Sequence, residues 1–274
     1  MADYRTIQVT VSGGAARINL NRPDVHNAFN DELLQELADA IRHAARNGDA
    51  RVLVITGNGK SFCAGADLNW MRMVLDYKVE QNKKDAATLV DLLDLLEACP
   101  KPVVGRINGA AIGGGVGLVA VCDIAIASSE AKFGFGEVKL GIIPAMISPY
   151  VLRKIGRGPA RELFLTGDRF DAGRAREIGL VNDVAPPEKL DDAVNAKVAA
   201  LLTSAPGALA EAKKLIRIVP DMEASEAREY TLTKIAELRA CPEGQEGMRA
   251  FLEKRKPEWA GGAGASAERG DRGG

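Results

Sequence analysis

The sequence Asn-Gly-Ala-Ala-Ile-Gly-Gly-Gly-Val-Gly, at residues 108–117, lies between two apolar runs at 103–107 and 118–121. This pattern predicts a strand, a glycine-dense turn and then a helix of small residues. The three consecutive glycines at 113–115 can adopt backbone angles closed to other residues, so their bare N–H groups can come close to a ligand. The first N–H groups of the helix have no partner within it and carry the positive end of its dipole. Such a turn suits a developing oxyanion better than a metal ion.

A second turn of the same kind occupies residues 61–68, Ser-Phe-Cys-Ala-Gly-Ala-Asp-Leu, after a strand predicted at 52–56. Two N–H donors from separate strand-to-turn segments are what a bidentate oxyanion hole needs. Many loops contain one glycine-rich turn, so the specific signal is the pair of turns, followed by Cys-Asp-Ile-Ala at 122–125. On these motifs the chain resembles the crotonase (enoyl-CoA hydratase/isomerase) superfamily, from Thr6 to about Trp259.

Length and charge bound the classes of function. The chain has 274 residues, enough for one large domain or one domain with an appendage. With 36 Lys and Arg against 37 Asp and Glu, its net charge is -1, which gives no general basic surface for nucleic acid. No apolar run approaches a membrane span, and the first residues lack the apolar segment of a targeting signal. We therefore expect a soluble, cytoplasmic protein that binds neither nucleic acid nor a membrane.

The cysteines and histidines give no sign of a metal site. The cysteines are Cys63, Cys99, Cys122 and Cys241. They lack the spacing of metal ligands, and we expect reduced thiols in a reducing compartment rather than disulfides. His26 and His43 show neither triad spacing nor metal-ligand spacing. We therefore expect no metal ion.

Short strands and helices alternate through the first two thirds of the chain. Alternating apolar and polar residues at 7–11 and 16–21 predict a hairpin, and a helix capped by Asn30 follows it. Further strands are predicted at 103–107, 124–127 and 181–184. Further helices are predicted at 86–99, 147–155, 160–166 and 172–178, with a mobile polar connection at 77–84. The alternation implies an α/β fold with a mostly parallel sheet.

Arg106 is an unusual residue in an otherwise apolar strand. An arginine there must be paired or reach solvent, because burying it without a partner is costly. We expect it to bond a structural carboxylate, and Asp123 is the candidate. The alternative is that Arg106 helps to hold a charged acyl tail.

Beyond residues 186 and 187, both proline, the pattern becomes almost wholly helical. Helices are predicted at 191–204, 207–219, 225–239 and 244–254. We assign residues 1–204 to a core that carries the acyl-CoA site and 205–260 to a C-terminal helical region. The tail at 261–274 is rich in Gly, Ser and charge and is expected to be disordered. The resemblance implies a core of spiralling β-β-α repeats, with C-terminal helices that build homotrimers, often paired into hexamers.

The resemblance also implies the catalytic residues. The oxyanion donors fall on the N–H groups of Ala66 and Gly114, which would stabilise the negative charge of a thioester enolate. Hydratases of this family usually carry two glutamates, but Gly117 stands where the first is expected. The second falls on Glu137, whose apolar neighbours should partly desolvate the carboxylate and raise its pKa. Glu137 is therefore the expected acid–base residue.

The missing glutamate bears on the reaction. Gly117, the stretch at 62–71 and the stretch at 142–150 most resemble the bacterial methylglutaconyl-CoA hydratase branch. That branch implies reversible syn hydration of 3-methylglutaconyl-CoA to 3-hydroxy-3-methylglutaryl-CoA in leucine and isovalerate metabolism, without a cofactor beyond the CoA thioester. The acyl carboxylate, Ser148 or Tyr150 would assist the water. The alternatives are an enoyl-CoA isomerase, a general enoyl-CoA hydratase, and a non-catalytic CoA- or RNA-binding protein. The pair of glycine-rich turns, together with Glu137, argues against a non-catalytic protein.

Substrate contacts follow from the same resemblance. CoA would lie along the loop at 64–68 and the turn at 25–28, with Asp67 capping and orienting that loop. Trp70 belongs to an apolar cluster that is either core packing or the wall of an acyl pocket. Lys254 and Arg255 would meet CoA phosphates, although a basic cluster at a helix C-terminus is equally explained by the helix dipole. The expected binding residues are Val25, Ala28, Ala64, Gly65, Asp67, Leu68, Trp70, Gly113, Pro144, Tyr150, Lys254 and Arg255.

Overall fold

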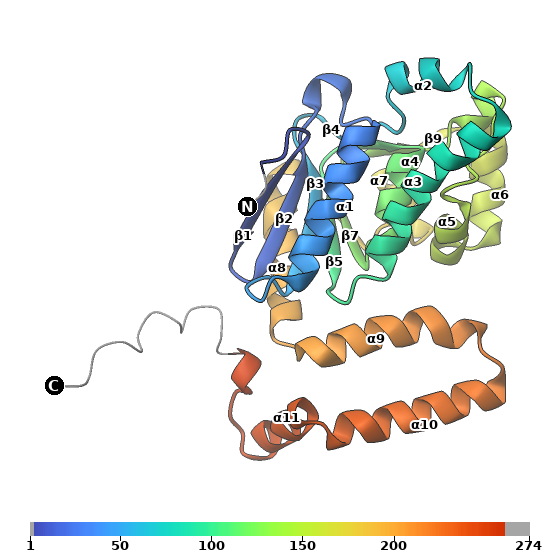
Figure 1. Ribbon diagram of the computed structural model, residues 1–274. Helices are drawn as coiled ribbons and strands as arrows, with labels where there is room; N and C mark the ends of the chain where they lie inside the picture. The colour runs from blue at the N-terminus through green and yellow to red at the C-terminus, as the bar shows by residue number, and fades with distance from the viewer. Residues whose placement is uncertain (1–2, 261–274) are drawn as a thin grey trace.

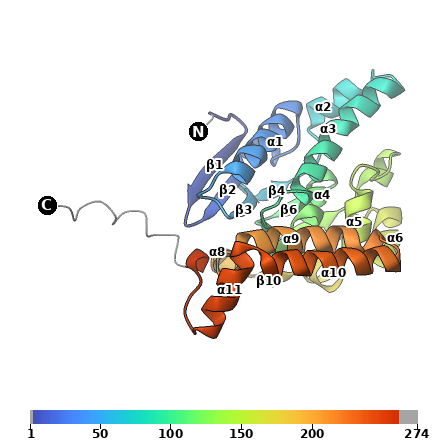
Figure 2. The same cartoon turned by 60° about the horizontal axis from the view of Figure 1, so that its bottom comes forward.

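The computed structural model describes residues 3–260, which form an α/β core and a separate layer of C-terminal helices (Figures 1 and 2). The core contains a six-stranded sheet in the order β1-β2-β3-β5-β7-β10. Its strands are β1 (Ile7–Ser12), β2 (Ala15–Leu20), β3 (Val52–Gly57), β5 (Val103–Ile107), β7 (Ile124–Ser128) and β10 (Asp183–Ala185). The predicted hairpin of β1 and β2 is confirmed, and the other neighbouring strands are parallel. Gly13 and Gly14 close the hairpin with positive φ angles.

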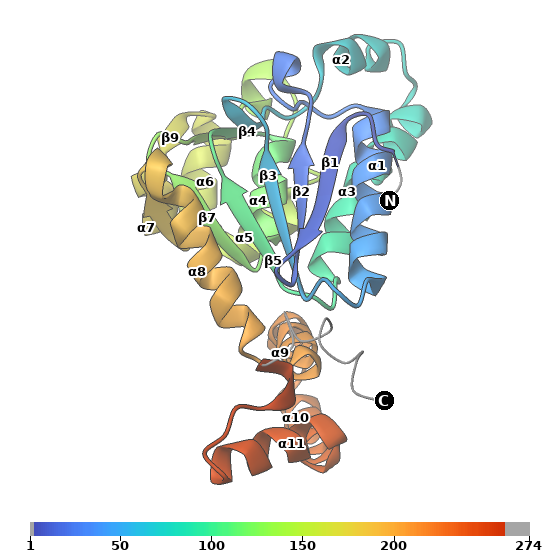
Figure 3. The ribbon, with the colours of Figure 1, turned by 90° about the vertical axis from the view of Figure 1, so that its left-hand side faces the viewer.

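Helices cover both faces of this sheet (Figure 3). The covering helices are α1 (Asp31–Arg46), α3 (Val79–Glu97) and α8 (Leu190–Leu202). Leu53 and Ile55 of β3 pack with apolar side chains of α1 and α3, whereas Val52 and Val54 pack with those of α8. A strand buried on both faces reads as a continuous apolar run, because side chains alternate between the two faces. The larger of the two apolar clusters, which is the main core, lies between the sheet and helices α1 and α3.

A second, four-stranded sheet has the order β4-β6-β8-β9. Its strands are β4 (Ser61–Cys63), β6 (Ala110–Ile112), β8 (Lys132–Gly134) and β9 (Arg169–Asp171). β4, β6 and β8 are parallel, and β9 is antiparallel to β8. The predicted mostly parallel pairing is confirmed, but it is divided between two sheets. The second sheet was not predicted, because strands of three residues are too short to show a period. The chain passes from β3 to β4, from β5 to β6 and from β7 to β8, which confirms the β-β-α spiral.

The remaining elements surround the second sheet or connect the others. The helices are α2 (Leu68–Val74), α4 (Gly114–Val121), α5 (Ser148–Ile155), α6 (Arg157–Thr166) and α7 (Ala172–Glu177). Short 3₁₀ helices are η1 (Pro23–Val25), η2 (Glu137–Leu140), η3 (Pro187–Lys189), η4 (Val219–Asp221) and η5 (Glu258–Ala260). All four cysteines are free thiols, as predicted.

Two local predictions need correction, and the first concerns α3. This helix begins at Val79, so most of the stretch at 77–84 is helical rather than a mobile connection. The side chain of Gln81 accepts a hydrogen bond of 2.9 Å from the N–H of Lys78, which caps the first turn. The polar residues of this stretch lie on the first turns of α3, which are exposed to solvent and therefore need no apolar face. Burial begins only at Leu89.

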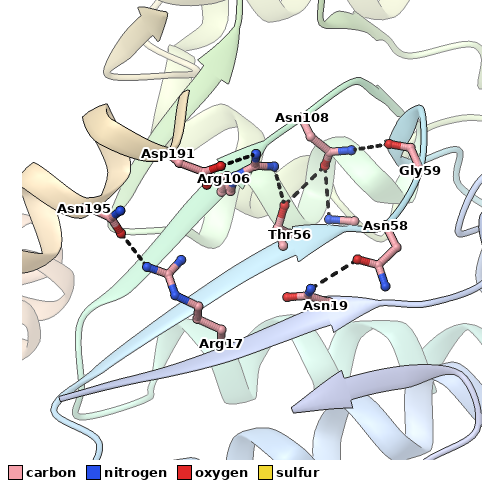
Figure 4. A network of polar contacts seen from close by, with 10 residues as sticks. Arg17, Asn19, Thr56, Asn58, Gly59, Arg106, Asn108, Asp191 and Asn195 are labelled. Carbon is pink, nitrogen blue, oxygen red and sulfur yellow. Dashed lines mark hydrogen bonds and ion pairs between the residues drawn. The ribbon is translucent and has the colours of Figure 1, made fainter. Parts of the chain in front are cut away.

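The second correction concerns Arg106, which pairs with Asp191 of α8 and not with Asp123 (Figure 4). Its Nε and Nη2 lie 2.7 and 3.2 Å from the two carboxylate oxygens of Asp191. A weaker contact of 3.4 Å joins Nη1 to Thr56 Oγ1. Asp123 instead accepts a hydrogen bond from the ammonium group of Lys213 at 2.7 Å. The physical reason is that Arg106 lies on the sheet face that α8 covers.

The C-terminal helices are α9 (Pro206–Ile218), α10 (Ala224–Ala240) and α11 (Pro242–Leu252). α9 and α10 run side by side, away from the sheets (Figures 1 and 2). Lys213 anchors α9 to the core through Asp123, and Arg51 donates to the carbonyls of Ser204 and Trp259. The predicted boundary at Ala205 falls on the N-cap of α9. The tail predicted to be disordered lies outside the described residues. Within those residues, none of the helices is long and apolar enough to span a membrane.

Close contact between α4 and β4 yields a stability prediction. A Cβ on Gly115 would overlap the main-chain carbonyl of Cys63. Gly115→Ala should therefore lower the free energy of unfolding by about 1–3 kcal/mol, as overpacking does in cores. Urea denaturation with an unchanged m-value measures the loss. Gly158→Ala in α6 is the matched control, because its Cβ would have no neighbouring atom within 4 Å. Equal losses in both variants would contradict the close packing of α4 on β4.

Candidate active site

Three segments singled out in the sequence lie at the carboxyl ends of three neighbouring parallel strands. Ala66 lies in the turn after β4, Gly114 begins α4 after β6, and Glu137 begins η2 after β8. Because parallel neighbours end at the same edge of a sheet, these segments converge there. The second sheet, although each strand has only three residues, thus brings together residues that are up to 71 positions apart in the sequence, from 66 to 137.

The two glycine turns touch each other. Gly65 has a φ of 88°, and a Cβ at this position would lie 2.9 Å from the Ile112 carbonyl oxygen and 3.8 Å from the Gly114 nitrogen. Gly113 has a φ of 52° and donates its N–H to the Gly134 carbonyl at 2.9 Å. Both positions need glycine, because side chains rarely adopt these backbone angles.

The direction of the Ala66 N–H is set by two hydrogen bonds that join its chain neighbours, Gly65 and Asp67, to Phe29. Phe29 N–H donates to the Gly65 carbonyl at 2.6 Å, and Asp67 N–H donates to the Phe29 carbonyl at 2.9 Å. The Gly65–Ala66 peptide is trans, so its C=O and N–H point in opposite directions, and the Ala66 N–H points away from Phe29. Ala66 is exposed, and no acceptor for its N–H or for that of Gly114 lies among residues 3–260. The site thus offers two free main-chain donors.

Glu137 places a half-buried carboxylate beside Gly113, the residue before Gly114. A Cβ placed on Gly113 would lie 3.1 Å from Oε1 of Glu137, so the carboxylate lies directly over this turn. Its other oxygen, Oε2, is buried and has no hydrogen-bond partner among the described residues. Burial raises the pKa of Glu137, because desolvation disfavours the charged form. A carboxylate with a raised pKa and a free oxygen suits general acid–base work.

The position expected for the other glutamate, Gly117, is closed by an apolar side chain. Gly117 is buried in α4, and a Cβ there would lie 2.5 Å from Cγ2 of Ile147 and 3.3 Å from Cδ1 of Leu93. Ile147 itself is 2% exposed. A carboxylate side chain would have to displace these groups. Within residues 3–260, Glu137 is therefore the one glutamate at the two positions where hydratases of the resembled family usually carry one.

The loop at 64–68 and the turn at 25–28 are brought together as expected. Ala64 N–H donates to the His26 carbonyl at 3.0 Å, and both Val25 and Leu68 are exposed. Asp67 caps α2 by accepting from the Asn69 N–H at 2.8 Å, which agrees with its expected orienting role. Leu68, two residues after Ala66, and Val25, on the adjoining turn, therefore each offer an exposed apolar side chain.

Trp70 and Tyr150 are held by carboxylates of α3. Trp70 is buried and donates from Nε1 to Asp85 at 2.7 Å, which ties α2 to α3. The hydroxyl of Tyr150 donates to Asp94 at 2.6 Å, and burial together with this bond raises its pKa. Ser148 donates to the carbonyl of Ala145. The suggested role of Tyr150 and Ser148 in assisting water gains no support from these contacts.

Lys254 and Arg255 lie apart from the other expected residues. They follow α11, at the opposite end of the molecule from β4 and α2 in both Figures 1 and 3. Arg255 is bound to Glu246 at 2.6 and 2.8 Å and to Glu253 at 2.7 Å. A CoA contact from these residues would have to reach a neighbouring subunit.

Pro144, another of the expected binding residues, is buried and follows η2, the helix that Glu137 begins.

Two residues that shape the site, Arg22 and Ile147, are not among those expected from the sequence. Arg22 forms an ion pair of 2.8 Å with Asp67, and the only sequence signal is the Asn-Arg-Pro break after β2. Ile147 carries no signal, because its role depends on how α5 packs on α4. Among residues 3–260, no three His, Cys, Asp or Glu side chains gather as a metal site.

Known proteins share this architecture over almost the whole chain. The family model described as enoyl-CoA hydratase/isomerase matches residues 10–262. A putative enoyl-CoA hydratase of Thermus thermophilus is 34% identical over 247 residues, 90% of this chain and 98% of that protein. The 2,3-dehydroadipyl-CoA hydratase of Escherichia coli is 36% identical over 252 residues, 89% of this chain and 94% of that protein. The crystal structure of an enoyl-CoA hydratase from Shewanella pealeana has a TM-score of 0.90 and 42% identity, covering 93% of this chain and 96% of that one.

Replacing Glu137 should raise stability. Because burial raises the pKa of Glu137, the folded state is penalised wherever this carboxyl is ionised. Glu137→Gln should therefore increase the free energy of unfolding at neutral pH. The gain should vanish below the ordinary glutamate pKa of about 4.3, where the carboxyl is neutral in both states. Urea denaturation at neutral and acidic pH measures it, and the exposed Glu130→Gln is the control. A loss of stability at neutral pH would contradict the desolvation of Glu137.

Proposed function

We propose that this chain, which belongs to the enoyl-CoA hydratase/isomerase family, catalyses reversible syn addition of water to 3-methylglutaconyl-CoA, giving 3-hydroxy-3-methylglutaryl-CoA. The observation that carries the proposal is the convergence of two free main-chain N–H donors with one partly desolvated carboxylate that has an unpartnered oxygen. The proposal takes one reaction of this hydratase/isomerase family, hydration, and one acyl group. Leucine and isovalerate metabolism is the setting in which such a substrate arises.

The proposed chemistry needs no group beyond the CoA thioester. The N–H groups of Ala66 and Gly114 bind the thioester oxygen, whose negative charge grows as water attacks C3 of the double bond. Glu137 takes one proton from that water and delivers a proton to C2, so that one water molecule is added in total. A single carboxylate acts on one face, which gives syn addition. Losing one such N–H donor costs about 3–4 kcal/mol in typical oxyanion holes.

A carboxylated acyl group fits a site with a single glutamate. Ile147 fills the space beside Gly117, so the water has only one protein carboxylate to hold it. The carboxylate of a 3-methylglutaconyl group would supply a second acceptor for that water. A relative named as a 2,3-dehydroadipyl-CoA hydratase indicates by its name that dicarboxylic acyl groups occur within this family. These two observations support the choice of substrate.

An enoyl-CoA isomerase is the second candidate, favoured by the same closed space at Gly117. Moving a double bond requires one proton to be taken from one carbon and returned to another on the same face. One carboxylate can do this without water. The two functions therefore differ in whether the product has gained the mass of water.

A panel of substrates tests the proposed reaction. Purified protein is given 3-methylglutaconyl-CoA, 3-hydroxy-3-methylglutaryl-CoA, crotonyl-CoA and a 3-enoyl-CoA, and products are identified by mass spectrometry. We expect interconversion of the first pair and little change in the others. Glu137→Gln should slow it by about 10²–10⁴-fold, the usual worth of general acid–base catalysis, while Glu130→Gln should not. Double-bond migration without gain of water would establish the isomerase instead.

We further propose that the C-terminal layer assembles trimers or hexamers. Its helices leave their apolar side chains exposed. Among the residues of α9, α10 and α11, Ala250 alone is buried. The exposed members are Leu215, Ile216, Leu232, Ile235, Met248, Phe251 and Leu252. Apolar patches of this kind commonly mark subunit interfaces.

Light scattering after size-exclusion chromatography tests the assembly. The protein should have three or six times the chain mass of 29.1 kDa. Leu232→Glu should shift it toward the single-chain mass, because a charge would be buried in the interface. Thr233→Glu is the matched control on the same helix, one residue further along. A single-chain mass for the unmodified protein at micromolar concentration would refute the assembly.

A further inference from the structure

The direction of the Ala66 donor depends on a two-residue bridge to Phe29. Both hydrogen bonds of this bridge involve the peptide groups on either side of Ala66. If Phe29 moved away, nothing else in the bridge would fix the plane of the Ala66 peptide. The position of Phe29 is therefore part of the geometry of the oxyanion hole.

One side chain holds both sides of this bridge. The Nη1 of Arg22 donates to the carbonyl of Ala28 at 2.6 Å, next to Phe29. Its Nη2 donates to Oδ2 of Asp67 at 2.8 Å, next to Ala66. The planar guanidinium thus spans the two segments at a fixed separation. The Arg22 side chain is 20% exposed and that of Asp67 is 6% exposed, so water screens the pair only weakly.

The segment that Arg22 holds also needs restraint. His26 and Asn27 have φ angles of 54° and 56°, which non-glycine residues rarely adopt. Asn27 is fully buried, accepts from the Arg22 N–H at 2.8 Å and donates to the carbonyl of Ser61 at 2.9 Å. These bonds tie the turn to β4 itself. A backbone in uncommon angles persists only where its surroundings hold it, and the Arg22 guanidinium adds its bond to the Ala28 carbonyl to this restraint.

We propose that Arg22 is a positioning residue for the reaction. Its guanidinium acts through Ala28 and Asp67 to hold the Phe29 bridge, and the bridge aims the Ala66 N–H at the thioester oxygen. Arg22 itself does not touch the substrate in this scheme. The inference rests on the proposed function, because it assumes that the Ala66 N–H binds a thioester carbonyl.

The first test is steady-state kinetics of Arg22→Gln and Arg22→Lys. A misaimed donor should lower kcat by about 10–100-fold, since small misplacements of catalytic groups have effects of this size. KM should change much less, because the charge that the Ala66 donor stabilises on the thioester oxygen grows only in the transition state. Lysine keeps the charge but lacks the planar fork, so Arg22→Lys should fall between wild type and Arg22→Gln. Arg174→Lys is the matched control, because the Arg174 guanidinium likewise joins two groups, Glu162 of α6 and Glu177 of α7, but lies outside the candidate site.

A spectroscopic readout separates positioning from folding. The infrared C=O band of a carbonyl-labelled, unreactive acyl-CoA should move to lower frequency when the wild-type hole binds it. In Arg22→Gln and Arg22→Lys this shift should be smaller, while thermal unfolding shows the proteins folded during the measurement. A full shift in a folded Arg22→Lys protein whose kcat is reduced would overturn the positioning role, as would unchanged kcat in both variants. An absent shift in the wild type would instead overturn the proposed function, and the role of Arg22 with it.

Discussion

Hydrogen bonding among β4, β6 and β8 is the interaction on which the candidate site depends. Each of these strands has three residues, and parallel pairs of that length have few bonds of their own. They pair because β3, β5 and β7, which precede them, are already aligned in the six-stranded sheet. Each turn of the chain therefore reaches the second sheet beside the preceding one, with an irregularity in the β4–β6 pairing between Ser61 and Cys63. The geometry of the candidate site is consequently a property of the stacked repeats and not of any single loop.

Much of the fold follows from local patterns in the sequence. The strands of the first sheet and most helices have enough residues to show a period, and the glycine turns require particular backbone angles wherever they occur. The second sheet gives no such signal, because a three-residue strand has no period to detect. The partner of Arg106 depends on tertiary docking: Arg106 shares a sheet face with Val104, which packs in the α8 cluster, and only the placement of α8 brings Asp191 to that face.

The candidate site, too, has residues that could be predicted from the sequence and residues that could not. Ala66, Gly114 and Glu137 belong to motifs whose order along the chain could be read, and the structure brings them together. The absence of a glutamate at Gly117 could also be read, but its replacement by Ile147, 30 residues later, could not, because that contact depends on how two helices pack. Arg22 is separated from Asp67 by 45 residues, and a break in a strand is all that its sequence context shows.

Both proposed oxyanion donors are main-chain groups, which has an evolutionary consequence. A point mutation changes a side chain but leaves the peptide N–H in place, so the hole survives most substitutions at Ala66. The residues around it, including Gly117 and Ile147, can meanwhile drift and admit other acyl groups or other placements of the acid. Selection can then explore new reactions while the stabilisation of the enolate is inherited unchanged. An ancestral enzyme of this architecture could thus give rise to descendants with different chemistry through a handful of codon changes.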